Sequence, residues 1–133
     1  MAGSVRDLAG YRLERARENL HAAIVLYDAG DYKASLNRSY YSIFHAIRAV
    51  NALDSFDSKK HSGVISHFIQ YHVKNNEFPR QSSRVVQKAS VMRENADYED
   101  FFVASKTDAN EQIRNAEEFL GLVEEYLEKM DDI

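Results

Sequence analysis

The stretch NRSYYSIFHAIRAV, residues 37–50, has the periodicity of an amphipathic helix but contains more aromatic and charged residues than an ordinary core helix. On a helix, its apolar side chains recur at steps of four and three, and a polar stripe lies about 200° away. The pattern predicts a central packing helix with candidate functional side chains on its other face. The apolar stripe comprises Leu36, Tyr40, Ile43, Ile47 and Val50, and the polar stripe comprises Arg38, Tyr41, His45 and Arg48.

The rest of the chain is also helical in pattern. One proline and five glycines in 133 residues, with almost no alternation of apolar and polar residues, favour an all-α fold. We predict an antiparallel bundle of four long helices plus a short fifth helix, in a single domain over residues 1–133. The expected helices span about residues 5–29, 32–53, 60–73, 79–94 and 108–130.

Capping residues set the expected helix ends. Ser4 and Asp31 should cap the first two helices, because their side-chain oxygens can accept from free backbone N–H groups. Gly30 should end the first helix. The expected caps are Asp57 or Ser58 for the third helix and Thr107 or Asp108 for the last.

The bulk composition excludes several classes of protein. The chain has no cysteine, so it has no disulfide, thiolate nucleophile or thiolate zinc site. The first twenty residues carry charges throughout and no apolar run, so neither a signal peptide nor a membrane span is expected there. We therefore expect a cytoplasmic protein with no membrane contact.

Charge is segregated along the chain. The net charge of −4 is the sum of a balanced segment 1–57, a segment 58–93 at +6 and a segment 94–133 at −10. A basic middle is typical of proteins that meet phosphates or an acidic partner, whereas an acidic terminal helix is commonly a solvated face. The basic line at spacing four in the fourth helix faces either solvent or a ligand: Arg80, Arg84 and Lys88.

Three segments resemble the HEPN domain family, in particular its small stand-alone prokaryotic members. They are RSYYSIFHAIRAV from Arg38, SKKHSGVISHF from Ser58 and RENADY from Arg93, and the resemblance spans residues 12–130. It implies a helical bundle that forms a homodimer and has a link to nucleotide or RNA chemistry. It also implies a partner, often a small nucleotidyltransferase in a toxin–antitoxin pair.

Many members of that family are metal-independent ribonucleases whose motif is an arginine followed after four to six residues by a histidine. A histidine can move a proton at the RNA 2′-hydroxyl while an arginine stabilises charge on the phosphate. The arginine best matches Arg93, but Tyr98 stands five positions later and no histidine follows His72. A phenol, whose ordinary pKa is about 10, is a poor general base at neutral pH. The presence of Tyr98 in place of the motif histidine argues against ribonuclease activity of the usual kind.

Two further groups are candidate sites. Arg38 and His45, with six residues between them on the second helix, would present a guanidinium and an imidazole along one groove. The alternative is a structural His45 that is buried and hydrogen-bonded to a neighbouring helix. Lys59, Lys60 and His61 open the third helix, where backbone N–H groups favour an anion such as phosphate. The alternative there is a solvated basic turn.

The sequence predicts no metal site and no cofactor. His61, His67 and His72 are separated by six and five residues, whereas separations of three or four align ligands on one face of an α-helix. A glycine-rich phosphate loop, a nucleophile elbow and a zincin pair are absent from the sequence.

Three functions follow as hypotheses. In the preferred one, a homodimeric HEPN protein binds a nucleotidyltransferase partner and a nucleotide or RNA. Arg93 then contacts phosphate, Asp97 orients it or caps a turn, and Tyr98 donates a hydrogen bond or accepts modification by the partner. The first alternative is a metal-independent endoribonuclease toxin with Arg93 as the phosphate-binding group and Tyr98 or His45 as the proton carrier. The second alternative is a non-catalytic scaffold module.

Overall fold

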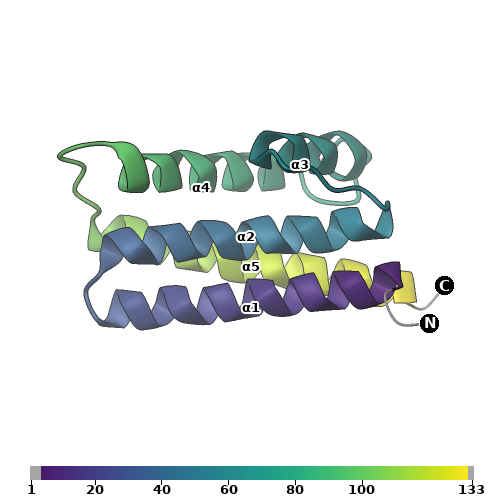
Figure 1. Ribbon diagram of the computed structural model, residues 1–133, viewed down its shortest axis with the longest axis horizontal. Coiled ribbons are helices and arrows are strands. Elements are labelled where there is room, and N and C mark those ends of the chain that lie inside the picture. The colour runs from purple at the N-terminus through teal and green to yellow at the C-terminus, as the bar shows by residue number, and fades with distance from the viewer. Residues whose placement is uncertain (1–3, 132–133) are drawn as a thin grey trace.

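A computed structural model describes residues 4–131, which form helices joined by short loops (Figure 1). This part of the chain has four long helices, one short helix and no β-strand, which confirms the predicted all-α bundle. None of these helices is both long and apolar enough to cross a membrane. The elements are α1 (Val5–Asp28), α2 (Tyr32–Leu53), α3 (His61–Phe68), the π-helical turn η1 (Ile69–Val73), α4 (Gln81–Tyr98) and α5 (Lys106–Asp131).

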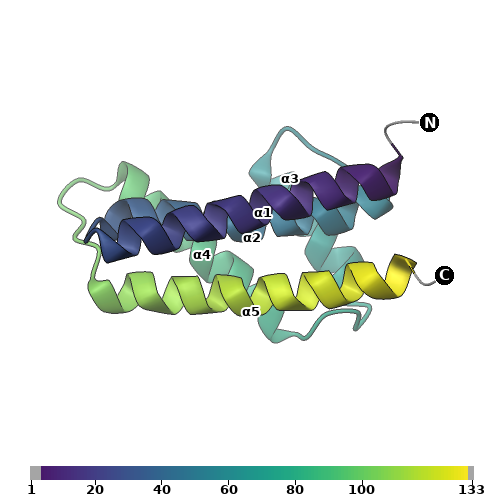
Figure 2. The same ribbon diagram turned by 90° about the horizontal axis from the view of Figure 1, so that it is seen from below.

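Helix α2 lies at the centre of the bundle and packs against each of the other four helices. Helices α1 and α2 form an antiparallel hairpin, and α5 lies beside both of them (Figures 1 and 2). Helices α3 and α4 follow one another along the side of α2 that faces away from α1 (Figure 1). Side chains of α2 that point away from α1 can therefore contact α3, α4 or α5.

The apolar stripe of α2 forms the middle of the core. Leu36, Tyr40, Ile43, Ile47 and Val50 are each no more than 1% exposed. Burial of a large apolar side chain of this kind contributes about 1.5–3 kcal/mol, so this stripe is a main source of stability. The prediction that residues 37–50 form the central packing helix is confirmed.

Small polar side chains allow α1 and α2 to pack closely. The hydroxyl of Ser35 donates to the carbonyl of Ala23, and that of Ser42 donates to the carbonyl of Ala16, both at 2.8 Å. All four residues are fully buried. The serines thus satisfy their own buried hydroxyls against the backbone of the neighbouring helix.

The first two helices begin and end where the sequence predicts. Ser4 caps α1 in a capping box with Asp7, and the side chain of Asp31 accepts from the backbone N–H of Ala34 at 3.1 Å. Gly30, at φ +81°, has the left-handed conformation that glycine adopts without steric cost, and it reverses the chain between α1 and α2.

Two predicted caps are wrong. The N-cap of α3 is Lys60, which has no capping side chain, while the hydroxyl of Ser58 accepts from the N–H of Lys60 at 3.2 Å. This contact fixes the loop before α3. The first turn of α5 is capped by Ser105, whose hydroxyl accepts from the N–H of Asp108 at 2.9 Å, so α5 begins at Lys106.

Helix α4 differs from its predicted extent at both ends. It begins at Gln81, and it ends at Tyr98, beyond the predicted end at Glu94. Asp97 and Tyr98 therefore lie on the last turn of a helix, and not in a loop as predicted. Tertiary contacts of Asp97 with α2, described below, account for the additional turn because they hold the end of the helix against its neighbour.

Candidate functional site

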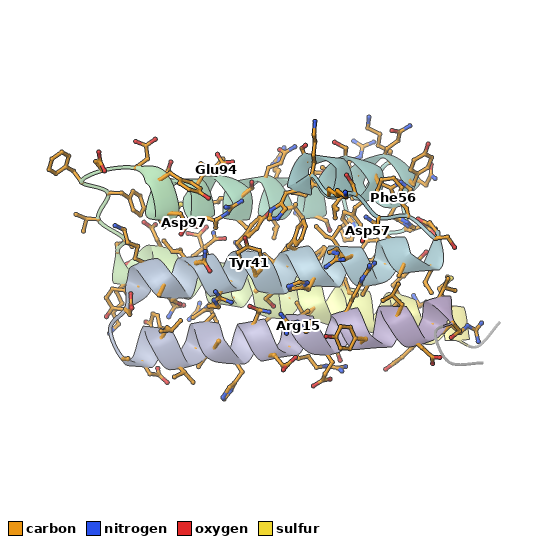
Figure 3. All side chains as sticks on the ribbon, in the orientation of Figure 1. Arg15, Tyr41, Phe56, Asp57, Glu94 and Asp97 are labelled. Carbon is orange, nitrogen blue, oxygen red and sulfur yellow. The ribbon has the colours of Figure 1, made fainter. Side chains whose placement is uncertain are left out.

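Arg93 of α4 lies across two consecutive tyrosines of α2. Its guanidinium carbon is 4.7 Å from the ring centroid of Tyr40 and 5.8 Å from that of Tyr41, which are cation–π distances. Figure 3 shows Tyr41 on the side of α2 that faces α4. The Arg93 side chain is only 12% exposed, so its orientation is fixed by packing.

Asp97 and Tyr98 lie one turn further along α4 and surround the same guanidinium. A carboxylate oxygen of Asp97 is 3.8 Å from Nη1 of Arg93 and accepts from the side-chain amide of Asn37 at 3.0 Å. The ring of Tyr98 is 5.9 Å from the guanidinium and is 74% exposed. The result is a polar cluster between α2 and α4 with one exposed aromatic side chain at its edge.

His61 joins this cluster from the first residue of α3. Its Nδ1 is 2.9 Å from the hydroxyl of Tyr40, and its ring stacks on Phe44 with centroids 4.2 Å apart. Burial, followed by the positive charges of Arg93 and Arg48, lowers the pKa of His61 below its ordinary value of 6.5. Both effects favour the neutral imidazole, a form in which one ring nitrogen can accept a proton and the other can donate one.

Burial and neighbouring side chains act in opposite directions on the pKa of Arg93. Burial acts to lower the pKa of the guanidinium, but the neighbouring Tyr40, Tyr41 and Asp97 outweigh it and raise that pKa. Arg93 thus keeps its charge throughout the physiological range. Its Nε is buried without a hydrogen-bond partner among the described residues.

His45, another candidate catalytic residue, lies beside Tyr41, with ring centroids 6.2 Å apart. Burial and then the charges of Arg48, Arg15 and Arg12 lower the pKa of His45 to about 4. Two of these arginines belong to α1, and Figure 3 shows Arg15 on that helix. No hydrogen bond to Nδ1 of His45 is found within residues 4–131, so the expected bond to a neighbouring helix is not made at this atom.

An open pocket of about 520 Å³ lies beside His61, a volume in the range of small-ligand sites. Asp57 accepts from Arg48 at 3.0 Å and from the buried Arg12 at 3.1 Å. Burial acts to raise the pKa of Asp57, but these arginines and the N–H of Ser58 outweigh it and lower that pKa. The pocket is lined by Phe44, Arg48, Asp57, Ser58, Lys59 and His61.

Of the remaining sequence-predicted residues, Arg38 contacts the edge of the cluster through Tyr41. Arg38 donates to the side chain of Asn19 at 3.1 Å and lies 5.8 Å from the ring centroid of Tyr41. Lys60 is exposed at the N-cap of α3. No contact joins Arg38 to His45 in the described part of the chain. The basic line on α4 is exposed, and its Lys88 pairs with Glu111 of α5.

Sequence reasoning missed the part that Tyr40, Phe44 and Asn37 play in the cluster. Tyr40 belongs to the apolar stripe and is buried, yet its hydroxyl reaches His61 and its ring supports Arg93. The signal was present, because a tyrosine within an apolar stripe requires a partner for its hydroxyl. The identity of that partner depends on how α3 returns to α2, which no local pattern encodes.

Comparison with known proteins identifies a family model and several relatives that match most of the chain. Residues 9–126 match a family model described as HEPN domain. A protein named "Putative toxin" from Methanocaldococcus jannaschii is 30% identical over 115 residues, which cover 86% of this chain and 78% of the relative. A second protein of that name from the same organism is 34% identical over 94 residues, covering 71% and 70%. A UPF0332 protein from Thermotoga maritima is 28% identical over 120 residues, covering 90% and 91%.

Proposed function

The chain belongs to the HEPN domain family, and on this basis we propose that it is a cytoplasmic toxin–antitoxin protein that binds the phosphate of a nucleotide or RNA at Arg93. We further propose that it pairs with a small nucleotidyltransferase. The names of the two Methanocaldococcus relatives support the toxin–antitoxin setting. The observation that carries the phosphate site is the orientation of Arg93 by Tyr40 and Tyr41.

The chemistry of the cluster suits a phosphate with an attached base. A guanidinium that is fixed by packing loses little conformational entropy when it binds an anion, and it presents parallel donors to phosphate oxygens. The exposed ring of Tyr98, beside the guanidinium, offers a surface on which a base can stack. Arg48 and Lys59 in the neighbouring pocket extend the positive charge along the same side of α2.

Titration of labelled RNA or ATP at two salt concentrations tests this proposal. Arg93→Ala should weaken binding about 10- to 100-fold, because hydrogen bonds to charged groups contribute about 1.5–3 kcal/mol. It should also reduce the salt dependence, since one phosphate contact is lost. The matched control is Arg84→Ala, which removes an exposed arginine of the same helix. Equal binding by the Arg93 variant and wild type would refute the assignment, and absence of binding at both salt concentrations would favour the scaffold alternative.

Pairing with a nucleotidyltransferase is tested by co-expression with the product of an adjacent reading frame and copurification. The hydroxyl of Tyr98 is accessible to such a partner, because this side chain is 74% exposed at the end of α4. A gain of mass on Tyr98, absent from Tyr98→Phe, is the expected result if the partner modifies it. A partner that copurifies equally with both proteins would place the pairing surface elsewhere than at this hydroxyl.

An endoribonuclease is the second candidate, and the position of His61 favours it. The imidazole of His61, on α3, lies within hydrogen-bonding distance of Tyr40, the residue whose ring also contacts Arg93, whereas the family motif has its histidine a few positions after the arginine in sequence. In this reading His61 carries the proton, in place of Tyr98 or His45, and Arg93 binds the phosphate. Cleavage of RNA in EDTA that is lost in both Arg93→Ala and His61→Asn, but kept in His45→Gln, would establish an enzyme.

Assembly into a homodimer is supported by apolar side chains between α4 and α5. Phe101 and Val103 are 101% and 83% exposed, and this segment projects beyond the ends of the helices (Figure 1). Exposed apolar side chains that lie next to each other can contribute to an interaction surface. Light scattering after size-exclusion chromatography should give a dimer for wild type and a monomer for Phe101→Ser combined with Val103→Ser. A monomeric wild type at micromolar concentration would contradict this proposal.

A further inference from the structure

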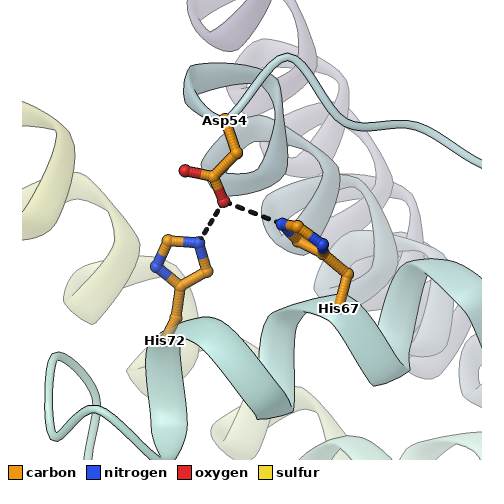
Figure 4. Close-up of side chains that lie close together, drawn as sticks. All are labelled: Asp54, His67 and His72. Carbon is orange, nitrogen blue, oxygen red and sulfur yellow. Dashed lines mark hydrogen bonds and ion pairs between the residues drawn. The ribbon is translucent and has the colours of Figure 1, made fainter.

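A second cluster of ionisable side chains lies at the end of α3 remote from His61 (Figure 4). Oδ2 of Asp54 is 2.9 Å from Nε2 of His67 and 2.6 Å from Nε2 of His72. One ligand atom from each of the three residues lies within 4.8 Å of the other two. Asp54 is the C-cap of α2, so the cluster joins the end of α2 to α3 and η1.

The π-helical turn brings the two histidines to one side of the helix. They are five residues apart, a spacing that would direct their side chains to different faces of a regular α-helix. The chain instead forms η1 directly after α3, and the N–H of Lys74 bonds to the carbonyl of Ile69, five residues earlier, at 2.9 Å. Because a π-turn holds an extra residue, positions five apart become neighbours. The sequence predicted no metal site because residues five apart do not share a face of a regular α-helix. The π-turn removes that objection for His67 and His72.

Neighbouring side chains orient both rings. Nδ1 of His72 is 2.7 Å from a carboxylate oxygen of Glu77, whose other oxygen accepts from the hydroxyl of Tyr126 at 3.2 Å. This contact holds the ring so that Nε2 is directed at Asp54. The ring of His67 is stacked on Phe56, with centroids 3.9 Å apart and planes 7° from parallel. Glu77 thus provides His72 with the carboxylate that metal-binding histidines typically have on the ring nitrogen that faces away from the metal.

We propose that Asp54, His67 and His72 bind a divalent transition-metal ion, best represented by zinc. Two imidazole nitrogens and one carboxylate oxygen are ligands that zinc prefers, and a solvent molecule can complete a tetrahedral set. The Asp54 side chain is 34% exposed, so solvent reaches the cluster, whereas His72 is 3% exposed and anchors it.

A modest adjustment converts the hydrogen-bonded cluster into a coordination site. Zinc–ligand bonds of about 2.0–2.2 Å in a tetrahedron separate the ligand atoms by about 3.3 Å. The two N–O separations of 2.9 Å and 2.6 Å therefore need to increase by less than about 1 Å, which the exposed carboxylate can provide, and the two imidazole nitrogens, which lie within 4.8 Å of each other, need to settle at about 3.3 Å. The ion would then take the place of the direct contacts between the imidazole nitrogens and Asp54, and any proton held in those contacts would be released to solvent.

The bound ion would have a structural role. It would fasten α3 to the end of α2, and the same helix carries His61 at its first residue. The proposal does not depend on phosphate binding or catalysis at Arg93, because its ligands belong to a separate cluster. Its test therefore measures metal binding alone.

Calorimetric titration of the full chain, without an affinity tag, with zinc chloride tests the site. Wild type should bind one zinc ion per chain, and Co²⁺ should give the visible absorption of a four-coordinate site. Asp54→Asn and His67→Gln change side chains at the edge of the cluster and should each weaken binding at least 10-fold. Glu77→Gln should weaken it about 10- to 100-fold, since this residue only orients a ligand.

Two controls keep the result interpretable. His21→Gln removes an exposed histidine of α1 and should bind zinc as wild type does. Circular dichroism without metal should show that the Asp54 and His67 variants are folded. Variants of His72 are left out of the test because this residue is buried, so that its replacement could unfold the chain. Absence of zinc binding by wild type, or equal binding by wild type and by the Asp54 and His67 variants, would overturn the proposal.

Discussion

The depressed pKa of His45 predicts a specific pH dependence of stability. In the folded chain this pKa is about 4, compared with 6.5 for the ordinary side chain, because of burial and then the charges of Arg48, Arg15 and Arg12. The unfolded chain therefore binds a proton between these two values while the folded chain does not. The contribution of His45 to stability is fully present above pH 6.5, and it is lost as the pH falls from 6.5 toward 4.

The magnitude follows from the two pKa values. At about 1.36 kcal/mol per pKa unit, the full effect has an upper limit of about 3.4 kcal/mol. Between pH 7 and pH 5, about 1.8 kcal/mol of this contribution to the free energy of unfolding is lost. Because the ring is partly exposed, screening by solvent lowers this value, and we expect about 1–2 kcal/mol.

The assay is urea unfolding of wild type, His45→Gln and His21→Gln at pH 7 and pH 5. Other titrating groups, including His61, are common to all three proteins, so their effects cancel in the comparison. The free energy of unfolding of His45→Gln should fall about 1–2 kcal/mol less on acidification than that of wild type. The His21 variant should follow wild type, because His21 is exposed. If all three proteins lose the same stability with unchanged m-values, the account of His45 is refuted.

Three further substitutions test the packing described above. Ile47→Ala removes a side chain with 0% exposure from the central helix and should destabilise the chain by about 2–5 kcal/mol in urea unfolding; a loss below about 1 kcal/mol would contradict the central position of α2. Gly30→Ala should cost about 1–2 kcal/mol through the backbone alone, because φ is +81° and a Cβ there meets no atom within 4 Å; an unchanged melting temperature would argue against this conformation. Asp57→Asn should cost about 1–3 kcal/mol at pH 7 by leaving the buried Arg12 without its charged partner. Since the pKa of Asp57 is lowered, this difference should shrink as the pH falls below 3.8, and a constant difference would show that the charge is not responsible.

Local patterns were sufficient where one residue decides the structure. Ser4 and Asp31 were recognised as caps because each directly precedes a helical pattern, and Gly30 because it stands between two such patterns. The stripe on α2 was recognised because its period matches that of a helix over four turns. These features make up most of the fold, which is why the bundle could be predicted.

The clusters could not be predicted in full because they depend on contacts between distant segments. Asp97 was assigned to a loop, since nothing near it in sequence indicates the amide of Asn37, sixty positions away, that holds it on α4. His61 was considered for its position at a helix N-terminus, whereas its pKa is set by burial and by Arg93 and Arg48. Sequence inspection found Arg93, Asp97, Tyr98 and His61, but neither the contacts between them nor the part played by Tyr40 and Asn37.

The π-turn also bears on how related chains are recognised. A chain lacking one residue of the turn, such as Gln70, would continue as a regular α-helix, and its two histidines would stand four positions apart on the same face. A gain or loss of one codon at this point therefore preserves the pairing of the histidines while it changes their spacing. A motif search with a fixed interval would separate two chains that share the same arrangement in space, and alignments that open a one-residue gap here would bring them together.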